Sequence, residues 1–201
     1  MPTAIGENSA KKKLAVNELV LCMGVNQLRT ANIAMIVAAC GFDAVYIDLE
    51  HNPTSLETAA AVCVAALGYA AIGQAEVCRR LNDETLLMAM IETPEAVGNA
   101  DEIAAVDGID VLHIGASDLS TEMGIPGQYQ HERMRAAFET VGKAARSHGK
   151  AMGVGGVRQD FEFQSWLLRL GVRYLTGGSD VGYILSAGRA DVKQLRELKL
   201  T

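Results

Sequence analysis

The sequence predicts an α/β fold in which helices cover a parallel β-sheet. Apolar runs of strand length alternate along the chain with longer stretches of helical spacing. Pro94 suits the first turn of a helix, and Gly41, Gly149 and Gly171 suit helix C-termini. The 201 residues are 49% hydrophobic, which is enough for one globular domain with a sizeable core.

Six apolar runs are predicted to be buried strands, at residues 19–25, 44–49, 85–91, 109–115, 151–154 and 174–176. Six helices are predicted at residues 30–40, 55–67, 94–105, 132–148, 160–170 and 181–198. A further helix at 74–81 precedes the third strand without a strand of its own, which breaks the alternation. Because six units do not close an eight-stranded barrel, the pattern fits either a (β/α)8 barrel lacking two units or an open doubly wound sheet.

Composition excludes several classes of partner. The net charge of -6 and the pI near 5.2 argue against nucleic acid and anionic membranes, which would be repelled, and leave small metabolites or proteins. The four cysteines, which we expect to be reduced core residues, are spaced too widely for a zinc knuckle or a redox pair. Neither a signal peptide nor a membrane span is recognisable, so we expect a cytoplasmic protein.

Polar residues at the predicted strand ends are the candidates for chemistry, since parallel α/β folds bind ligands there. Glu92 closes the third strand and Asp118 follows the fourth, so the two carboxylates could share a hard cation such as Mg²⁺ or Mn²⁺. Alternatively, Glu92 caps the helix that Pro94 begins and Asp118 forms a turn with Ser120. The residue pattern does not decide between these interpretations.

The second strand ends in a further polar group. His51 beside Asp48 could be a general base with its orienting carboxylate, or a surface histidine leading into Pro53. His113 lies within an apolar strand and is expected to be a hydrogen-bonded core residue.

Two glycine-rich turns follow the last two strands and are similar to the phosphate site of many barrels. Asp180 argues against that use because its charge would repel a phosphate.

Three motifs then indicate a family. GFDAVYIDLEHNP, MIETPEA and IDVLHIGASDLSTEMG occur in this order, and together they resemble the HpcH/HpaI family of 2-keto-3-deoxy-acid and 4-hydroxy-2-oxo-acid aldolases over about residues 19–198. The resemblance implies a (β/α)8 barrel, usually a homohexamer. It also implies a divalent-metal-dependent lyase that cleaves a 4-hydroxy-2-oxo acid to pyruvate and an aldehyde through a metal-stabilised enolate.

Carried over by position, the resemblance implies roles for particular residues. Glu92 and Asp118 would be the metal ligands, for Mg²⁺, Mn²⁺ or Co²⁺. Backbone amides near Ser117 and Asp118 would hold the carboxylate of pyruvate. His51 would help to move the proton, and Asp48 would support its loop or a neighbouring subunit's site.

The sequence also departs from the family pattern. Met90 stands where many members have glutamine, and the third and fourth strand–helix units, with a substrate-binding arginine, have no counterpart. We therefore expect a single barrel domain over residues 1–201 that lacks a segment near 68–69, because deleting two strands outright would expose sheet edges and core. Two alternatives are a catalytically inactive homologue and a citrate-lyase-like enzyme for acyl-CoA, although no basic residues for the CoA phosphates are recognisable.

Overall fold

The computed structural model describes residues 7–28, 30, 32–50, 52, 55, 57, 59, 79, 82–158 and 160–198. Outside these residues lie the seam expected near residues 68–69, most of the helices expected at 55–67 and 74–81, and His51 and Pro53.

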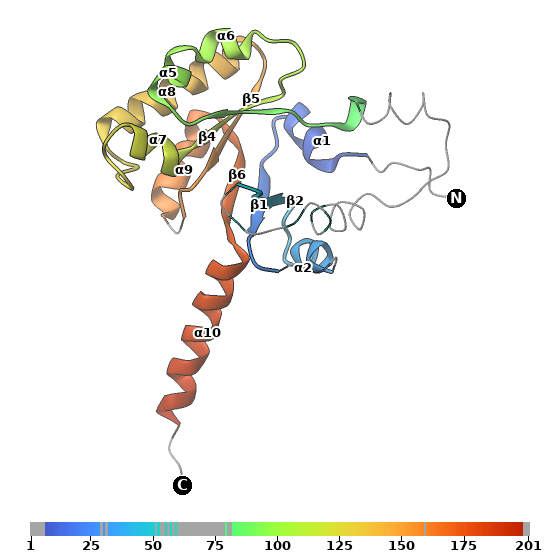
Figure 1. The fold of residues 1–201 in the computed structure, drawn as a ribbon, viewed down its shortest axis with the longest axis vertical. Coiled ribbons are helices and arrows are strands. Elements are labelled where there is room, and N and C mark those ends of the chain that lie inside the picture. Colours follow the sequence, from blue (N-terminus) through green and yellow to red (C-terminus); the bar gives the residue numbers. More distant parts are fainter. Residues whose placement is uncertain are drawn as a thin grey trace.

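A six-stranded parallel sheet forms the centre of the protein (Figure 1). Its strands are β1 (Val20–Val25), β2 (Ala44–Ile47), β3 (Met88–Ile91), β4 (Val111–Gly115), β5 (Ala151–Gly155) and β6 (Val172–Ser179). The strand order is β2-β1-β6-β5-β4-β3, and every neighbouring pair is parallel. All six predicted strands are therefore confirmed.

The sheet forms a curled half-barrel whose edges are β2 and β3. These are the two strands that border the largely undescribed stretch between residues 48 and 87. Tyr46 on β2 and Met90 on β3 are 44% and 46% exposed, so both edge strands carry large side chains that their neighbours do not cover. The described residues thus establish six parallel strands, and they do not contain the full eight-stranded barrel that the motifs suggested.

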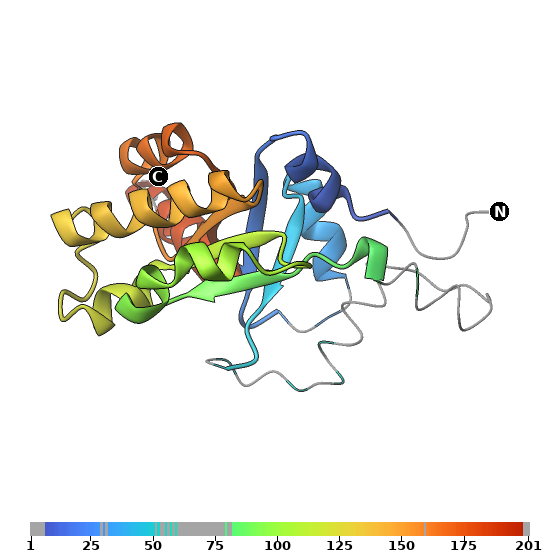
Figure 2. The same cartoon turned by 90° about the horizontal axis from the view of Figure 1, so that it is seen from above.

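Helices pack on the outer face of the sheet (Figure 2). They are α1 (Ser9–Ala15), α2 (Ile33–Ala39), α5 (Pro94–Gly98), α6 (Ala100–Ala104), α7 (Ala116–Glu122), α8 (Glu132–Ser147) and α9 (Phe161–Leu170). The last helix, α10 (Asp180–Glu197), follows β6 and projects away from the body (Figure 1). The expected helix at 94–105 is two short helices, and α1 and α7 were not predicted.

Local chemistry explains where the helices begin and end. Pro94 occupies the first turn of α5, as predicted, and the Thr93 side chain caps this helix by accepting a hydrogen bond from the Ala96 N–H at 3.1 Å. Gly171 ends α9 in a left-handed conformation with φ 116°. The cap on α5 is therefore Thr93, and the alternative in which Glu92 caps it is wrong.

The main core lies between β3–β6 and helices α5–α9. Phe138 on α8 is fully buried and contacts Phe163 and Trp166 edge-on, while Arg135 covers those two rings with its guanidinium group. This apolar layer packs against the helix-covered face of strands β3–β6, and the site residues lie at the carboxyl ends of the same strands.

Two further expectations concern cysteines and membranes. Cys22 is buried and free, as expected, whereas Cys40 is free but exposed, so its assignment to the core is wrong. Within the described part of the chain, no helix has both the length and the apolar character to cross a membrane.

Candidate functional site

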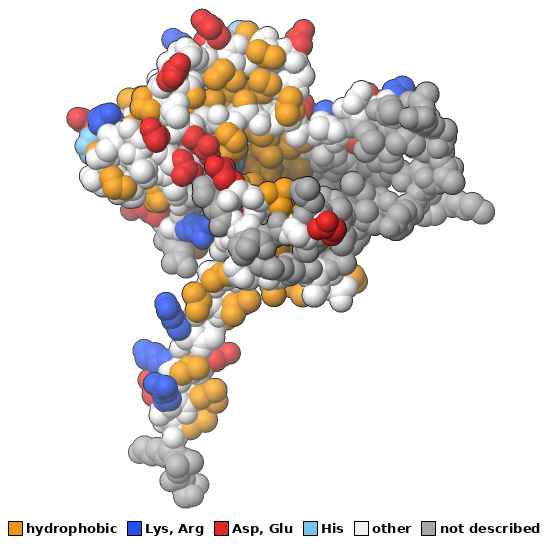
Figure 3. Space-filling model, viewed as in Figure 1, with side chains coloured by type: hydrophobic (Ala, Val, Ile, Leu, Met, Phe, Trp, Pro, Cys, Tyr) orange, Lys and Arg blue, Asp and Glu red, His pale blue; other side chains and the backbone are white. Residues whose placement is uncertain are grey.

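A cavity of about 460 Å³ opens on the concave side of the sheet, and each of the six strands or the loop after it contributes to its wall. It contains the predicted residues Asp48, Glu92, Ser117 and Asp118. Acidic side chains gather beside exposed apolar ones near the middle of the face seen in Figure 3. The structure therefore brings together four of the five predicted site residues, and the fifth, His51, is outside the described residues.

Glu92 leaves the end of β3 and lies over Gly115, the last residue of β4. A Cβ atom placed on Gly115 would be 2.4 Å from Glu92 Oε1 and 2.8 Å from its Cγ, so only glycine leaves room for this carboxylate. The helix α7 begins directly after Gly115, and Asp118 lies on its first turn. Both carboxylates consequently reach the cavity from neighbouring strand ends.

Ser117 lies at the start of α7, where the chain turns away from the sheet. Its carbonyl oxygen accepts hydrogen bonds from the hydroxyls of Ser120 and Thr121, each at 2.9 Å. Gly156, with φ 87°, packs against it so closely that a Cβ there would be 2.8 Å from Ser117 Oγ. The expected turn of Asp118 with Ser120 is thus the first part of a helix, which the sequence analysis missed because Ser, Asp and Thr are weak helix formers.

Asp48 follows β2 and accepts a hydrogen bond from the Glu50 N–H at 2.9 Å. The pKa of Tyr46, two residues earlier, is affected by the carboxylates around the cavity. Burial and the negative charges of Asp48, Glu92, Glu50 and Asp118 together raise the pKa of the Tyr46 phenol. Four carboxylates therefore act on one point, which is an arrangement that attracts a cation.

His113 projects from β4 into the floor of the cavity. It is 7% exposed, and its Nδ1 atom is buried without a hydrogen-bond partner in the described structure. Gly153 and Gly155 on β5 leave room for the ring, and Tyr174 contacts it edge-on. Burial lowers the pKa of His113 to about 4, so the ring is neutral at pH 7. His113 is buried, as predicted, but within the described structure it does not form the predicted hydrogen bond.

The carboxylate of Asp180 occupies the backbone N–H groups around it, so these groups are not available to bind an anion. Its carboxylate accepts hydrogen bonds at 2.8–3.0 Å from the backbone N–H groups of Asn26, Gln27, Leu28 and Val181. Burial alone would raise the pKa of Asp180, but these donors outweigh it and lower the pKa. Asp180 therefore disfavours a phosphate at this turn, both by its charge and by occupying these amides.

Arg158 is a cavity residue that the sequence analysis missed. It follows β5 and the turn at Gly155 and Gly156, and its Nη1 atom donates a hydrogen bond to Ser179 Oγ at 3.2 Å. Its position directly after a glycine-rich strand end was a usable signal. The sequence revealed no basic residues for CoA phosphates, and the structure places this one arginine at the cavity.

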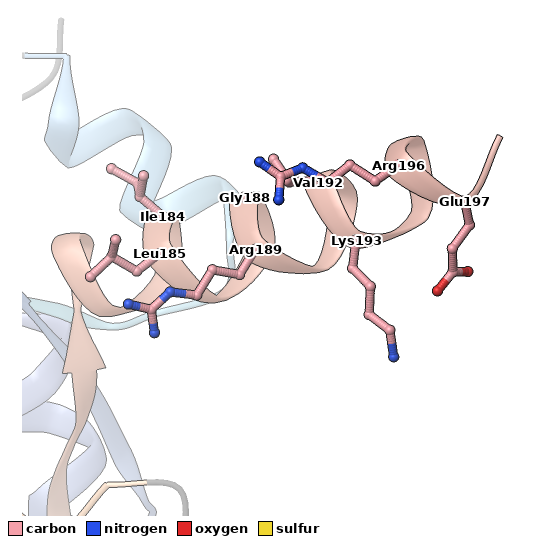
Figure 4. Close-up of a pocket in the computed structure, with 8 residues that line it drawn as sticks. All are labelled: Ile184, Leu185, Gly188, Arg189, Val192, Lys193, Arg196 and Glu197. Carbon is pink, nitrogen blue, oxygen red and sulfur yellow. The ribbon is translucent and has the colours of Figure 1, made fainter. Parts of the chain in front are cut away.

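A second hollow runs along α10, the helix that projects away from the body (Figures 1 and 4). Its lining combines apolar side chains such as Ile184 and Leu185 with Arg189, Lys193 and Arg196. It contains none of the predicted site residues, so the cavity inside the sheet remains the candidate active site.

The donor set in that cavity suits a hard cation. Within the described residues no group of three or more His, Cys, Asp or Glu side chains is placed to hold a metal, which leaves Glu92 and Asp118 as a pair. Two carboxylates with open positions for water and substrate oxygens are typical of Mg²⁺ and Mn²⁺ sites. The space that Gly115 leaves for Glu92 fits this use.

Comparison with known proteins agrees with this arrangement. The family model described as HpcH/HpaI aldolase/citrate lyase matches residues 59–187. The crystal structure of an HpcH/HpaI aldolase from Desulfitobacterium hafniense has a TM-score of 0.83 with 24% identity, and the match covers 94% of this chain and 97% of that chain.

Two fungal proteins named 4-hydroxy-4-methyl-2-oxoglutarate aldolase are similar in sequence. The Hapsidospora irregularis protein is 29% identical over 228 residues, covering 80% of this chain and 84% of its own length. The Chaetomium globosum protein is 27% identical over 249 residues, covering 90% of this chain and 92% of its own. Because 249 aligned positions exceed the 201 residues of this chain, the second protein has residues with no counterpart here.

Proposed function

This chain belongs to the HpcH/HpaI aldolase/citrate lyase family and is a carbon–carbon lyase, and we propose that it is a divalent-metal-dependent aldolase acting on a 4-hydroxy-2-oxo acid. The observation that carries the proposal is the pair of carboxylates, Glu92 and Asp118, in one cavity at neighbouring strand ends. The products would be pyruvate and an aldehyde, or a ketone when the 4-hydroxyl is tertiary.

The proposed reaction breaks the bond between C3 and C4 of the substrate. A base removes the proton of the 4-hydroxyl, the new carbonyl forms at C4, and the electron pair of the broken bond moves toward C2 and its oxygen. Return of a proton to C3 completes pyruvate. We assign the proton movement to His51 with support from Asp48, in line with the proton-transfer chemistry of histidine.

Glu92 and Asp118 would hold the divalent ion, which when bound supplies Lewis-acid polarisation of the 2-oxo group. The backbone amides at Ser117 and Asp118 would hold the substrate's carboxylate at C1. Mg²⁺, Mn²⁺ and Co²⁺ all accept two carboxylates, so we propose the class of ion and not one member.

Among the described residues the sheet ends at β2 and β3, and this supports the proposal that a barrel segment is missing near residues 68–69. Closing the barrel would require strands between β2 and β3, and the chain between these strands is where the expected seam lies. The excess length of the Chaetomium globosum alignment is consistent with this. An intact mass clearly above 21.4 kDa would support the missing segment, and a mass equal to it would count against that explanation.

The assay for the proposed function is release of pyruvate from a 4-hydroxy-2-oxo acid. We expect release that requires Mg²⁺, Mn²⁺ or Co²⁺, stops on chelation, and falls at least roughly 100-fold in E92Q and D118N, since each removes a charged metal ligand. E139Q, a change at an exposed glutamate on α8, should remain active. Release that persists with chelator or in E92Q would overturn the metal-dependent mechanism.

The two alternatives give different results. An inactive homologue would release no pyruvate from any such substrate with any of the three ions. Arg158 gives a citrate-lyase-like enzyme one basic group at the cavity, and acyl-CoA cleavage without pyruvate release would favour that enzyme.

We also propose that the protein is a homo-oligomer, a hexamer by the family resemblance, and that it is located in the cytoplasm. The exposed apolar side chains of α10 are consistent with contact to another subunit.

A further inference from the structure

Arg158 is the only side chain with a positive charge at pH 7 among the described residues that line the active-site cavity. The others with formal charge are acidic: Asp48, Glu50, Glu92 and Asp118. A divalent ion at Glu92 and Asp118 would offset two of these charges. The proposed reaction needs only the ion, a proton carrier and a site for the C1 carboxylate, so it leaves Arg158 without a role.

The position of Arg158 relative to the proposed metal pair is set by the sheet. β5 is the neighbour of β4, and adjacent strands lie about 4.8 Å apart. The loops after these strands touch, because Gly156 packs against Ser117. The Arg158 backbone therefore follows the strand beside the loop that carries Asp118, and its guanidinium group extends toward Ser179 at the end of β6, on the side of the cavity facing away from Glu92.

The guanidinium group is held on one side and open on another. Its Nη1 atom donates to Ser179 Oγ at 3.2 Å, and no other hydrogen bond of Arg158 occurs within the described structure. Because a guanidinium has five N–H donors in a rigid fork, the donors that Ser179 does not use can bind a carboxylate through two parallel hydrogen bonds. A ligand of the cavity can reach it, since Arg158 is exposed.

We propose that Arg158 binds a second carboxylate of the substrate, at C5, and so selects 4-hydroxy-2-oxo dicarboxylic acids. This inference rests on the proposed aldolase function. An extended five-carbon chain separates its two carboxyl carbons by roughly 5 Å, and metal coordination at one end with a hydrogen bond of about 2.9 Å at the other extends this reach past β5 toward the guanidinium group beside Ser179.

Electrostatics gives the substrate one orientation. If the 2-oxo group lies at Glu92 and Asp118, the remaining chain can extend along the sheet toward β5 and Arg158, or toward the β2 side. The β2 side carries Asp48 and Glu50, which would repel a carboxylate. A dianionic substrate is therefore directed toward Arg158, whereas an uncharged tail gains nothing from it.

The first test compares two substrates that differ at one group. 4-Hydroxy-4-methyl-2-oxoglutarate carries the C5 carboxylate, and 4-hydroxy-4-methyl-2-oxopentanoate has a methyl group there. In R158Q we expect kcat/KM for the dicarboxylate to fall roughly 10- to 100-fold, as for loss of a charge-assisted bidentate pair, and kcat/KM for the monocarboxylate to change by less than about threefold. R158K, which keeps the charge without the fork, should be intermediate.

R169Q is the matched control, because Arg169 is an exposed arginine on α9 outside the cavity. It should preserve the preference of the wild type. Equal losses on both substrates in R158Q would overturn the inference and leave the aldolase proposal intact. If the wild type cleaves neither substrate, the aldolase proposal fails.

A binding measurement distinguishes failure of the Arg158 inference from failure of the aldolase proposal. Calorimetry with Mn²⁺ present uses 2-oxoglutarate and 2-oxopentanoate, which lack the 4-hydroxyl and are not cleaved. The wild type should bind 2-oxoglutarate more tightly, and R158Q should lose that preference. If R158Q keeps it, Arg158 does not bind the second carboxylate, whatever the protein's catalytic activity.

Discussion

Replacing Gly115 by alanine tests the proposed metal site without removing either carboxylate. The new Cβ would lie 2.4 Å from Glu92 Oε1, 2.8 Å from its Cγ and 3.0 Å from its Cδ. Three consecutive atoms of Glu92 are too close, so the whole side chain must move and not merely its tip. Gly115 has φ -80°, which alanine adopts readily, and the strand itself should therefore tolerate the change.

The size of the effect follows from the displacement. Ordinary van der Waals contact begins at 3.4 Å, so Oε1 must retreat by about 1 Å. Bonds from Mg²⁺ to oxygen are about 2.1 Å long and vary by only about 0.2 Å, so a displaced Glu92 no longer coordinates in its original place. We expect a roughly 10- to 100-fold loss of metal affinity, or about 1.4–2.7 kcal/mol, with pyruvate release falling in parallel.

Calorimetric titration with Mn²⁺ measures this loss, and thermal unfolding without metal measures any change in folding. G98A is the matched control: nothing lies within 4 Å of a Cβ placed on Gly98, so its metal affinity should equal that of the wild type. G115A that binds Mn²⁺ within twofold of the wild type would refute the reasoning, because Glu92 would then not be a ligand held by this contact.

Two further predictions concern buried titratable groups. The pKa of His113 is about 4 in the folded protein and 6.5 ordinarily, so the unfolded chain takes up the proton first as pH falls through this interval. The free energy of unfolding should drop by about 2 kcal/mol more in the wild type than in H113F between pH 7.5 and pH 5 in urea denaturation, and equal drops would contradict this. D180N should lower the free energy of unfolding at pH 7 by roughly 1.5–3 kcal/mol, since the amide replaces a charged acceptor of four backbone N–H groups. Because the folded pKa of Asp180 lies below its ordinary value of 3.8, this difference should be complete above pH 3.8 and disappear as pH falls through the folded pKa; a difference that persists in acid would exclude this cause.

The sequence by itself determined the class of fold, because a parallel strand and its covering helix each leave a local signature. The six strands, and the helix starts and stops at Pro94 and Gly171, depend on residues close together in the chain. The motifs around Asp48, Glu92 and Asp118 likewise identified the family, since each motif is a continuous stretch of sequence.

Tertiary structure decided which residues share the cavity. Gly115 makes room for Glu92 from the next strand, and Arg158 meets Ser179 across β5 and β6. Among the described residues, His113 has no hydrogen-bond partner at Nδ1 although it is buried. These relations depend on strand order and register, which join residues far apart in the chain and which no local pattern encodes. The sequence therefore supplied the reactive groups, and the curl of the sheet determined which of them can act on one ligand.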